Sequence, residues 1–281
     1  MDAREFLGLQ PTHNPNRWYL PVVPGLSTGH SFLFGGCALA AAITAMESTT
    51  GRPLIWATAQ YLSYARPPSV MDIDVTVPIS GRATSQARAV GHVADTEILT
   101  VNAALGSRDT PATGSWVQRP DVPPPDECGP RTFRMDVEDS IMRRLEVRIA
   151  SARDFTEFDG TLSTDGRSSL WARIPDLLEP SAATLAILGD YVPFGIGQAL
   201  GEPAGGNSLD NTLRIGRLVP TEWVLIDVRI ETIAHGFGHG HVYLWAQDGT
   251  LMATASQSTI VRYWEDPGAP GSNPARAREN G

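Results

Sequence analysis

Apolar and polar residues alternate most regularly in the last third of the chain. Across residues 225–230, every second residue is branched and apolar, which is typical of a strand with one buried face. Residues 242–246 and 251–261 form two further apolar runs of β type. The dipeptide Asp248-Gly249 between them is a strong signal for a hairpin turn. The pattern predicts three strands in an antiparallel meander.

The same arrangement occurs earlier in the chain, between residues 61 and 105. Pro67 matches Pro220 and Asp95 matches Asp248, and both pairs are separated by 153 positions. A constant offset over so long a stretch indicates an internal duplication of one α+β unit. Two copies are too few for a solenoid, so we expect a pseudo-dimer within one chain.

Two segments predict apolar helices. Residues 32–52 read FLFGGCALAAAITAMESTTGR and are apolar nearly all round, so this helix should be buried and should end at Gly51. Residues 180–190, PSAATLAILGD, predict a shorter apolar helix with Ser181 as its N-cap. Residues 191–207 are rich in glycine, and we predict that they form a loop leading into the meander.

Each copy therefore combines a lead strand, a buried helix and an antiparallel set of strands. In the second copy the opening strand candidates are residues 145–150 and 169–174. A helix that is apolar on every face needs a sheet wrapped around it, and this arrangement is the hotdog fold. We predict an α+β double hotdog. Its parts are an N-terminal hotdog unit (residues 1–106), a proline-rich linker (107–137), a C-terminal hotdog unit (138–265) and a disordered tail (266–281).

Composition narrows the class of protein. Hydrophobic residues make up 42% of the 281, which is enough for a sizeable core. The net charge of −9 argues against a nucleic-acid partner, although one arginine or helix N-terminus could still hold a small anion. The first residues lack the basic and apolar regions of a signal peptide, and the longest apolar run, residues 37–46, is too short for a membrane span. We expect a cytoplasmic protein.

Several short motifs lack the context that their chemistry requires. Cys37 falls in the apolar helix and should be a buried thiol, and with Cys128 as the second cysteine no disulfide framework is indicated. Ser27 lies in a GxSxG pattern, but prolines precede it where a strand is needed. Residues 72–76, DIDVT, are better explained as a strand than as a phosphatase motif. A glycine-rich histidine cluster contains no carboxylate or cysteine, so we predict no metal there: His235, His239 and His241.

The second half resembles a known family in three segments, LAILGDYVPF, SLDNTLRIGRLVP and TASQSTIVR. They are similar to segments of the acyl-CoA thioesterase II family, whose double-hotdog members hydrolyse fatty acyl-CoA. FGGCALAAA also resembles the family's FGG segment at the start of the first helix. The resemblance covers roughly residues 25–264 and implies an acyl-CoA substrate with a role in lipid metabolism.

The resemblance also implies a catalytic set consisting of an Asp after the second copy's helix, a Thr or Ser on the next strand and a Gln on a late strand. In this sequence they are Asp190, Ser208 and Gln257. Three neighbours could replace Ser208 if the alignment shifts: Asn207, Asp210 and Thr212. The offset of 153 places Ile55 at the position of Ser208 and Ala104 at that of Gln257, so the first copy lacks both side chains.

These residue types suit hydrolysis of a thioester by water. A carboxylate can deprotonate water that Ser and Gln hold in place. The N–H of Gly36, at the start of a helix, is the expected donor to the oxyanion, and no metal or organic cofactor is required. Hotdog hydratases pair an Asp with a His, and no His follows Asp190 closely. The alternative is a non-catalytic acyl-CoA or lipid-binding protein. Further association of the sheets into a homo-oligomer is expected.

Overall fold

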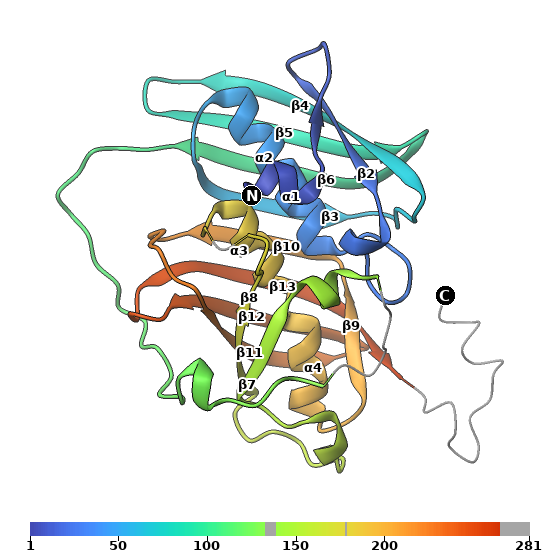
Figure 1. Ribbon diagram of the computed structural model, residues 1–281, viewed down its shortest axis with the longest axis vertical. Coiled ribbons are helices and arrows are strands. Elements are labelled where there is room, and N and C mark those ends of the chain that lie inside the picture. Colours follow the sequence, from blue (N-terminus) through green and yellow to red (C-terminus); the bar gives the residue numbers. More distant parts are fainter. Residues whose placement is uncertain (133–138, 178, 265–281) are drawn as a thin grey trace.

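The strands form one antiparallel sheet that runs through both copies of the duplicated unit (Figure 1). The computed structural model describes residues 1–132, 139–177 and 179–264. The first copy contains β1 (Gln10–Pro11), β2 (Arg17–Val22), β3 (Leu54–Tyr61), β4 (Ser69–Ser80), β5 (Thr84–Val93) and β6 (Thr96–Gly106). The second contains β7 (Glu146–Ser151), β8 (Arg167–Arg173), β9 (Ala204–Ser208), β10 (Asp210–Ile215), β11 (Val224–Ala234), β12 (Phe237–Ala246) and β13 (Leu251–Tyr263).

The helices pack on the inner face of this curved sheet (Figure 1). They are α1 (Ala3–Leu7), α2 (Gly35–Thr50), α3 (Ala182–Leu188) and α4 (Val192–Leu200). Single-turn 3₁₀ helices occur as η1 (Pro24–Leu26), η2 (Pro125–Glu127), η3 (Ile141–Arg144) and η4 (Phe155–Glu157). The predicted double hotdog is confirmed, with α2 as the central helix of the first copy and α4 as that of the second. Among the described residues, no helix is long and apolar enough to cross a membrane.

The sequence repeat coincides with the strands. The order β1-β2-β4-β5-β6-β3-β10-β13-β12-β11-β8-β7 reads the same from both ends once the copies are matched. Adding 153 to the bounds of β5 gives those of β12. The registers show that the offset becomes 154 from β6 and β13 onward, so Thr58 matches Thr212, and these two residues pair with each other at the centre of the sheet. A pseudo-twofold axis therefore passes between them, as expected for a pseudo-dimer.

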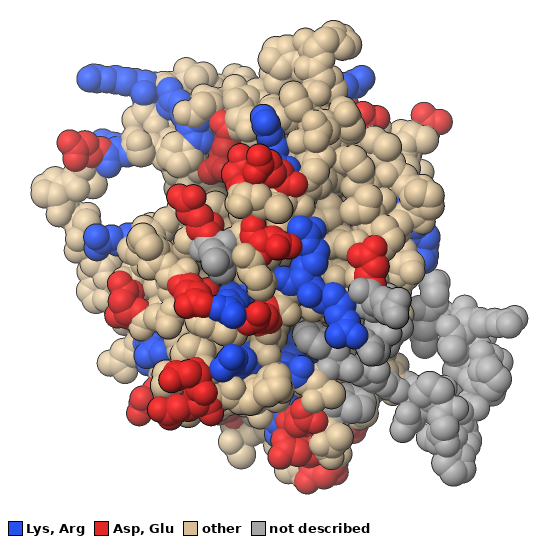
Figure 2. Space-filling model, in the orientation of Figure 1, with Lys and Arg blue, Asp and Glu red and all other residues tan. Residues whose placement is uncertain are grey.

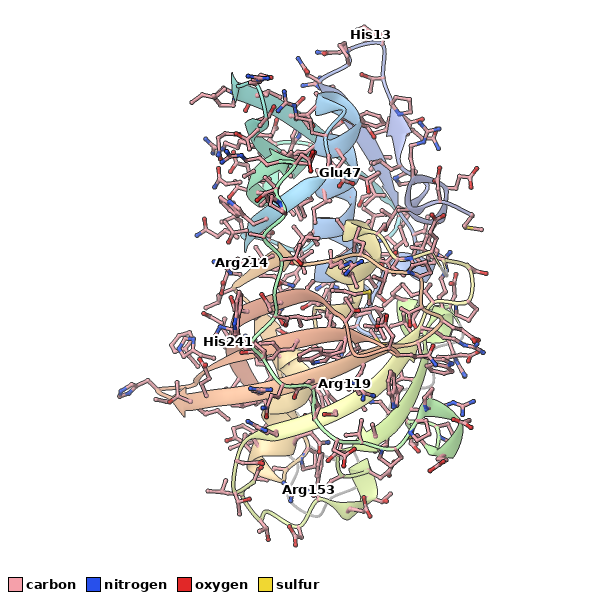
Figure 3. All side chains as sticks on the ribbon, turned by 90° about the vertical axis from the view of Figure 1, so that its left-hand side faces the viewer. His13, Glu47, Arg119, Arg153, Arg214 and His241 are labelled. Carbon is pink, nitrogen blue, oxygen red and sulfur yellow. The ribbon has the colours of Figure 1, made fainter. Side chains whose placement is uncertain are left out.

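The predicted buried helix in the first copy is confirmed as α2. Every residue from Gly36 to Met46 is buried, because α2 lies between the sheet and α3. The helix ends at Gly51, whose φ of 65° is a left-handed conformation that glycine adopts freely. Near this end, the Glu47 carboxylate accepts a hydrogen bond of 2.8 Å from Leu54 N, which ties α2 to the start of β3 (Figure 3).

The short helix α3 is also confirmed, and Ser181 caps it by accepting a hydrogen bond of 3.1 Å from Thr184 N. The meander prediction holds for β11, β12 and β13, with Asp248-Gly249 in the turn between the last two. Strand candidates 145–150 and 169–174 correspond to β7 and β8, each within two residues.

The prediction of a loop over residues 191–207 was wrong, because this segment forms α4 and β9. Its glycines serve close packing rather than flexibility. A Cβ on Gly195 would lie 2.6 Å from a Val228 methyl carbon, and one on Gly197 would lie 2.6 Å from Ala204 O. Pro193 stands in the first turn of α4, where its missing N–H removes no intrahelical hydrogen bond.

Residues 119–128 of the linker pack on the outer face of the second copy's strands. The Trp171 indole donates a hydrogen bond of 2.8 Å to Pro123 O, and the Arg119 guanidinium lies 5.3 Å from the Trp171 ring centre (Figure 3). Cys128 joins a small buried cluster there with Trp223 and Trp245. We propose that the first unit ends at residue 106, where β6 ends, and that the second unit begins at residue 138. Residues 133–138 and the predicted tail, 266–281, lie outside the described residues.

Charged side chains of both signs are interleaved on the face shown in Figure 2. Opposite charges are also paired on β8, where the Arg173 guanidinium bonds to both Glu146 and Glu222. Exposed pairs of this kind contribute little to stability. The charges on this face therefore alternate in sign rather than forming a continuous basic surface.

Candidate active site

Asp190 lies in the break between α3 and α4, and its side chain is 6% exposed. Its Oδ1 accepts a hydrogen bond of 2.5 Å from Gln257 Nε2 and one of 3.4 Å from Ser208 Oγ. Its Oδ2 accepts a hydrogen bond of 2.7 Å from Gly36 N, at the start of α2. The structure therefore brings together all four residues that the sequence singled out, with three from the second copy and one from the first.

Gln257 is held on all sides. It lies on the inner face of β13, and its Oε1 accepts a hydrogen bond of 3.1 Å from Val192 N in the first turn of α4. Its Nε2 donates to both Asp190 Oδ1 and Ser208 Oγ, the latter at 3.1 Å. An amide with its donors and acceptor all engaged has one orientation, so Gln257 fixes the rotamer of the carboxylate.

Ser208 is the member of the cluster that reaches the surface, since its side chain is only half-buried on β9. Its neighbours point elsewhere. Asn207 Nδ2 donates to the Tyr64 hydroxyl (2.7 Å), Asp210 Oδ1 accepts from Ser258 N (2.8 Å), and the Thr212 hydroxyl bonds to that of Thr58 (2.7 Å). Of the four candidates for this position, Ser208 is the one placed beside Asp190.

Two glycines allow α2 to begin against Asp190. A Cβ on Gly36 would lie 2.9 Å from both Ala186 O and the Ile187 Cα of α3, and one on Gly35 would lie 2.8 Å from Asp190 Oδ2. The Gly36 N–H, which the sequence predicts as the oxyanion donor, is hydrogen-bonded to the carboxylate in this structure. Its role toward an oxyanion stays a prediction.

Burial controls the ionisation of this cluster. It raises the pKa of Asp190 above the ordinary value, although hydrogen bonds from Gln257, Gly36 and Ser208 oppose the rise. The pKa of Tyr61 is raised well above its usual range, by burial first and then by the charge of Asp190. Its hydroxyl therefore stays protonated and donates a hydrogen bond of 3.0 Å to Gly35 O. Burial also raises the pKa of Cys37, which confirms a buried thiol rather than a nucleophile.

The cluster has no counterpart in the other copy. The offset of 153 places Cys37 at the position of Asp190 and Ile55 at that of Ser208, but the strand registers place Ala103, and not the predicted Ala104, at that of Gln257. These side chains supply neither a carboxylate nor an amide. The duplicated fold therefore holds this polar set once, where the second copy's strands meet the start of α2.

The other motifs have structural partners. Ser27 is buried and its hydroxyl donates to Val23 O at 2.9 Å. Asp74, within the DIDVT segment, pairs with Arg17 at 2.6 Å and with His92 at 3.1 Å. His241 pairs with Glu231 at 2.9 Å. In the part of the chain that the structure describes, no three His, Cys, Asp or Glu side chains are grouped so that they could hold a metal ion.

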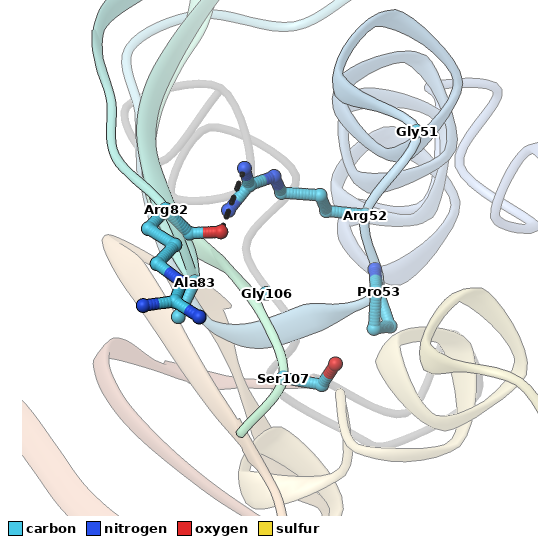
Figure 4. Close-up of a pocket in the computed structure, with 7 residues that line it drawn as sticks. All are labelled: Gly51, Arg52, Pro53, Arg82, Ala83, Gly106 and Ser107. Carbon is cyan, nitrogen blue, oxygen red and sulfur yellow. Dashed lines mark hydrogen bonds between the residues drawn. The ribbon is translucent and has the colours of Figure 1, made fainter. Parts of the chain in front are cut away.

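A small cavity of about 190 Å³ opens at the far end of α2 (Figure 4). It is lined by Gly51, Arg52, Pro53, Arg82, Ala83, Gly106 and Ser107. The Arg52 guanidinium donates to Gly81 O at 2.7 Å. The cavity shares no residue with the Asp190 cluster, which lies at the opposite end of the helix.

Two contributions to the site were missed from the sequence. The Val192 N–H that holds Gln257 belongs to α4. This helix was not predicted, because its segment is rich in glycine. Tyr61 comes from the first copy and reaches the cluster through Gly35. Only the repeat could have indicated that strands of both copies meet there.

Comparison with known proteins adds independent evidence. The sequence profile of the acyl-CoA thioesterase C-terminal domain matches residues 125–261. A candidate thioesterase from Novosphingobium aromaticivorans has 35% sequence identity and a TM-score of 0.81, with 90% of this chain and 97% of that chain covered. No curated protein matches the sequence.

Two more distant structures share the fold. A hotdog protein of unknown function from Alicyclobacillus acidocaldarius has 20% identity and a TM-score of 0.81, over 94% of this chain and 98% of that one. The acyl-CoA thioesterase II TesB2 from Mycobacterium marinum has 19% identity and a TM-score of 0.73, over 94% and 99%. At these identities the likeness concerns architecture alone.

Proposed function

The chain belongs to the acyl-CoA thioesterase II family, and on that premise we propose that it hydrolyses acyl-CoA to a free carboxylic acid and coenzyme A. One observation carries the proposal: a buried carboxylate, Asp190, is fixed by Gln257 and Ser208 beside the start of a helix. Orienting such a base by fixed hydrogen bonds favours proton abstraction from a bound water.

In the proposed reaction, Asp190 accepts a proton from water while the water oxygen attacks the thioester carbonyl carbon. The carbonyl π electrons move to its oxygen, which becomes an oxyanion. When that intermediate collapses, the C–S bond breaks and the sulfur leaves with the electron pair. The proton on Asp190 passes to the sulfur, which gives the free thiol and restores the base. Ser208 and Gln257 position the water and the carboxylate.

Substrate would reach Asp190 over Ser208, the partly exposed member of the cluster. Its neighbours in the chain lead to two exposed side chains: Leu209 follows it and is 36% exposed, and Tyr64, bonded to Asn207, is 49% exposed. We propose that the pantetheine arm crosses this apolar rim, with the CoA end at the surface and the acyl chain between the helices and the sheet. A cytoplasmic location, a homo-oligomeric state and a role in lipid metabolism stay predictions.

The direct test is release of free thiol from a panel of acyl-CoAs from short to long. Turnover on part of the panel is expected, and the preferred length would define the substrate class. If no acyl-CoA is turned over while several raise the melting temperature, the chain would be a binding protein that kept the fold. Loss of both turnover and binding would remove acyl-CoA as the ligand.

The pH dependence of kcat/KM gives a second prediction. Asp190 must be ionised to act as a base, and its pKa is raised by burial. Activity should therefore fall as the pH is lowered through that raised pKa, at a higher pH than the ordinary aspartate value of about 3.9 would give. Circular dichroism over the same range would show that the protein stays folded. A profile flat down to the ordinary aspartate value would contradict Asp190 as the base.

A further inference from the structure

The developing oxyanion needs a hydrogen-bond donor, and the Gly36 N–H is already engaged. It donates to Asp190 Oδ2 at 2.7 Å. The Val192 N–H is also engaged, because it donates to Gln257 Oε1. A donor for the thioester carbonyl should be buried near Asp190, aimed inward, and without an acceptor of its own.

Asn211 meets these requirements. It lies on β10 and is 1% exposed. Within the ranges that the structure describes, neither its Nδ2 nor its Oδ1 makes a hydrogen bond of normal length and angle. Burying an amide without good hydrogen bonds is unfavourable, and a bound ligand could supply the missing hydrogen bond.

The sheet register places Asn211 next to the cluster. Asn211 pairs with Ala59 on β3, and Tyr61 lies two residues further along that strand, on the same face. On its other side β10 pairs with β13, with Thr212 opposite Ser256. Continuing this register by one residue puts Asn211 beside Gln257.

Tyr61 links this amide to the reacting end of the site. A hydrogen-bonding interaction with the Asn211 side chain acts to lower the pKa of Tyr61, against the stronger effect of burial, so one N–H of the amide faces the phenol oxygen and the other is left for a ligand. A Cβ on Gly35 would stand 3.2 Å from the Tyr61 hydroxyl and 2.8 Å from Asp190 Oδ2. The phenol and the carboxylate therefore face the same point.

We propose that Asn211 Nδ2 donates a hydrogen bond to the thioester carbonyl oxygen and to the oxyanion that forms from it, an inference that rests on the proposed function. The repeat agrees with a single such donor. The registers of the strands place Ala57 at this position in the first copy, and its side chain carries no donor. Asn211 thus joins the polar set that only the second copy carries.

Turnover by Asn211→Ala and Asn211→Val is the first half of the test. Loss of one oxyanion donor should lower kcat by about 10²–10³-fold, with a smaller rise in KM because the bond to the carbonyl of the bound substrate is also lost. The melting temperature of both variants should not fall, because each substitution removes the poorly bonded amide of Asn211. Loss of a well-bonded structural amide would instead lower it. Thr212→Ala is the matched control, since Thr212 is adjacent but faces the opposite side, and it should retain wild-type kcat.

Affinity for two non-hydrolysable ligands is the second half. One is acyl-dethia-CoA, a ketone in which CH₂ replaces the sulfur, and the other is S-alkyl-CoA, which has no carbonyl. The wild type should bind the ketone more tightly, and both Asn211 variants should lose that preference. Variants that keep wild-type kcat, or keep the preference, would overturn the inference while leaving the hydrolase intact. A wild type without turnover would overturn the proposed function, and the ligand pair would still decide whether Asn211 meets a carbonyl.

Discussion

Replacing Asp190 by asparagine is expected to lower kcat for acyl-CoA hydrolysis by about 10²–10⁴-fold, the usual contribution of a general base. The substitution conserves volume but removes the group that takes the proton from water. Acyl-CoA binding should survive, because the surface rim around Tyr64 and Leu209 is unchanged. The fold should survive as well, since no heavy atom is added, although the new amide NH₂ faces one of the two donors, Gly36 N or Gln257 Nε2. Thiol release and acyl-CoA titration on the same preparation measure the two effects separately.

Asp210→Asn is the control for this experiment. Asp210 is also a second-copy carboxylate, but it accepts a hydrogen bond from Ser258 N instead of joining the Asp190 cluster. Its replacement should leave kcat near the wild-type value. If Asp190→Asn still turned over acyl-CoA at the wild-type rate, the chain would remain a hydrolase, but its base would have to be sought elsewhere.

Burial and hydrogen bonding act in opposite directions on the pKa of Asp190. Burial opposes ionisation and raises the pKa, while three hydrogen-bond donors favour the charged form and limit that rise. The result is a carboxylate more basic than one in water and yet fixed in position. Both properties favour proton abstraction, and the raised pKa depends on burial that an exposed aspartate lacks.

The architecture could be predicted from sequence because its signals are local or periodic. Alternating apolar residues predicted β11 to β13, and the apolar run predicted α2. The offset of 153 showed that the chain contains two copies of one unit. The failure at α4 has a physical cause. Gly195 and Gly197 are present because Val228 and Ala204 approach their Cα atoms, and no sequence pattern separates a glycine that permits contact from one that permits bending.

The site could be predicted only in part. Family resemblance pointed to Asp190, Ser208 and Gln257, and the structure places these three together. The contacts that fix them were not predictable, because they join distant segments. Gly36 N lies 154 positions from the carboxylate it contacts, and Asn211 gains its importance only from the register of β10 against its two neighbours.

Gly36→Ala is expected to weaken both the fold and the site. The added methyl would lie 2.9 Å from Ala186 O and from the Ile187 Cα, which are backbone atoms that cannot rotate away. Overpacking of this kind costs about 1–3 kcal/mol, whereas the better helix propensity of alanine returns at most about 1 kcal/mol. We therefore expect a net loss of about 1–2 kcal/mol in the free energy of unfolding, measured by urea denaturation.

Separation of α2 from α3 would also lengthen the hydrogen bond from Gly36 N to Asp190 Oδ2. Turnover should then fall even under conditions where the variant is folded, because the carboxylate loses one of its fixed donors. Gly129→Ala provides the control, since a Cβ at Gly129 would meet nothing within 4 Å and should change neither stability nor kcat. A Gly36→Ala protein as stable and as active as the wild type would show that α2 and α3 do not approach as closely as this packing requires.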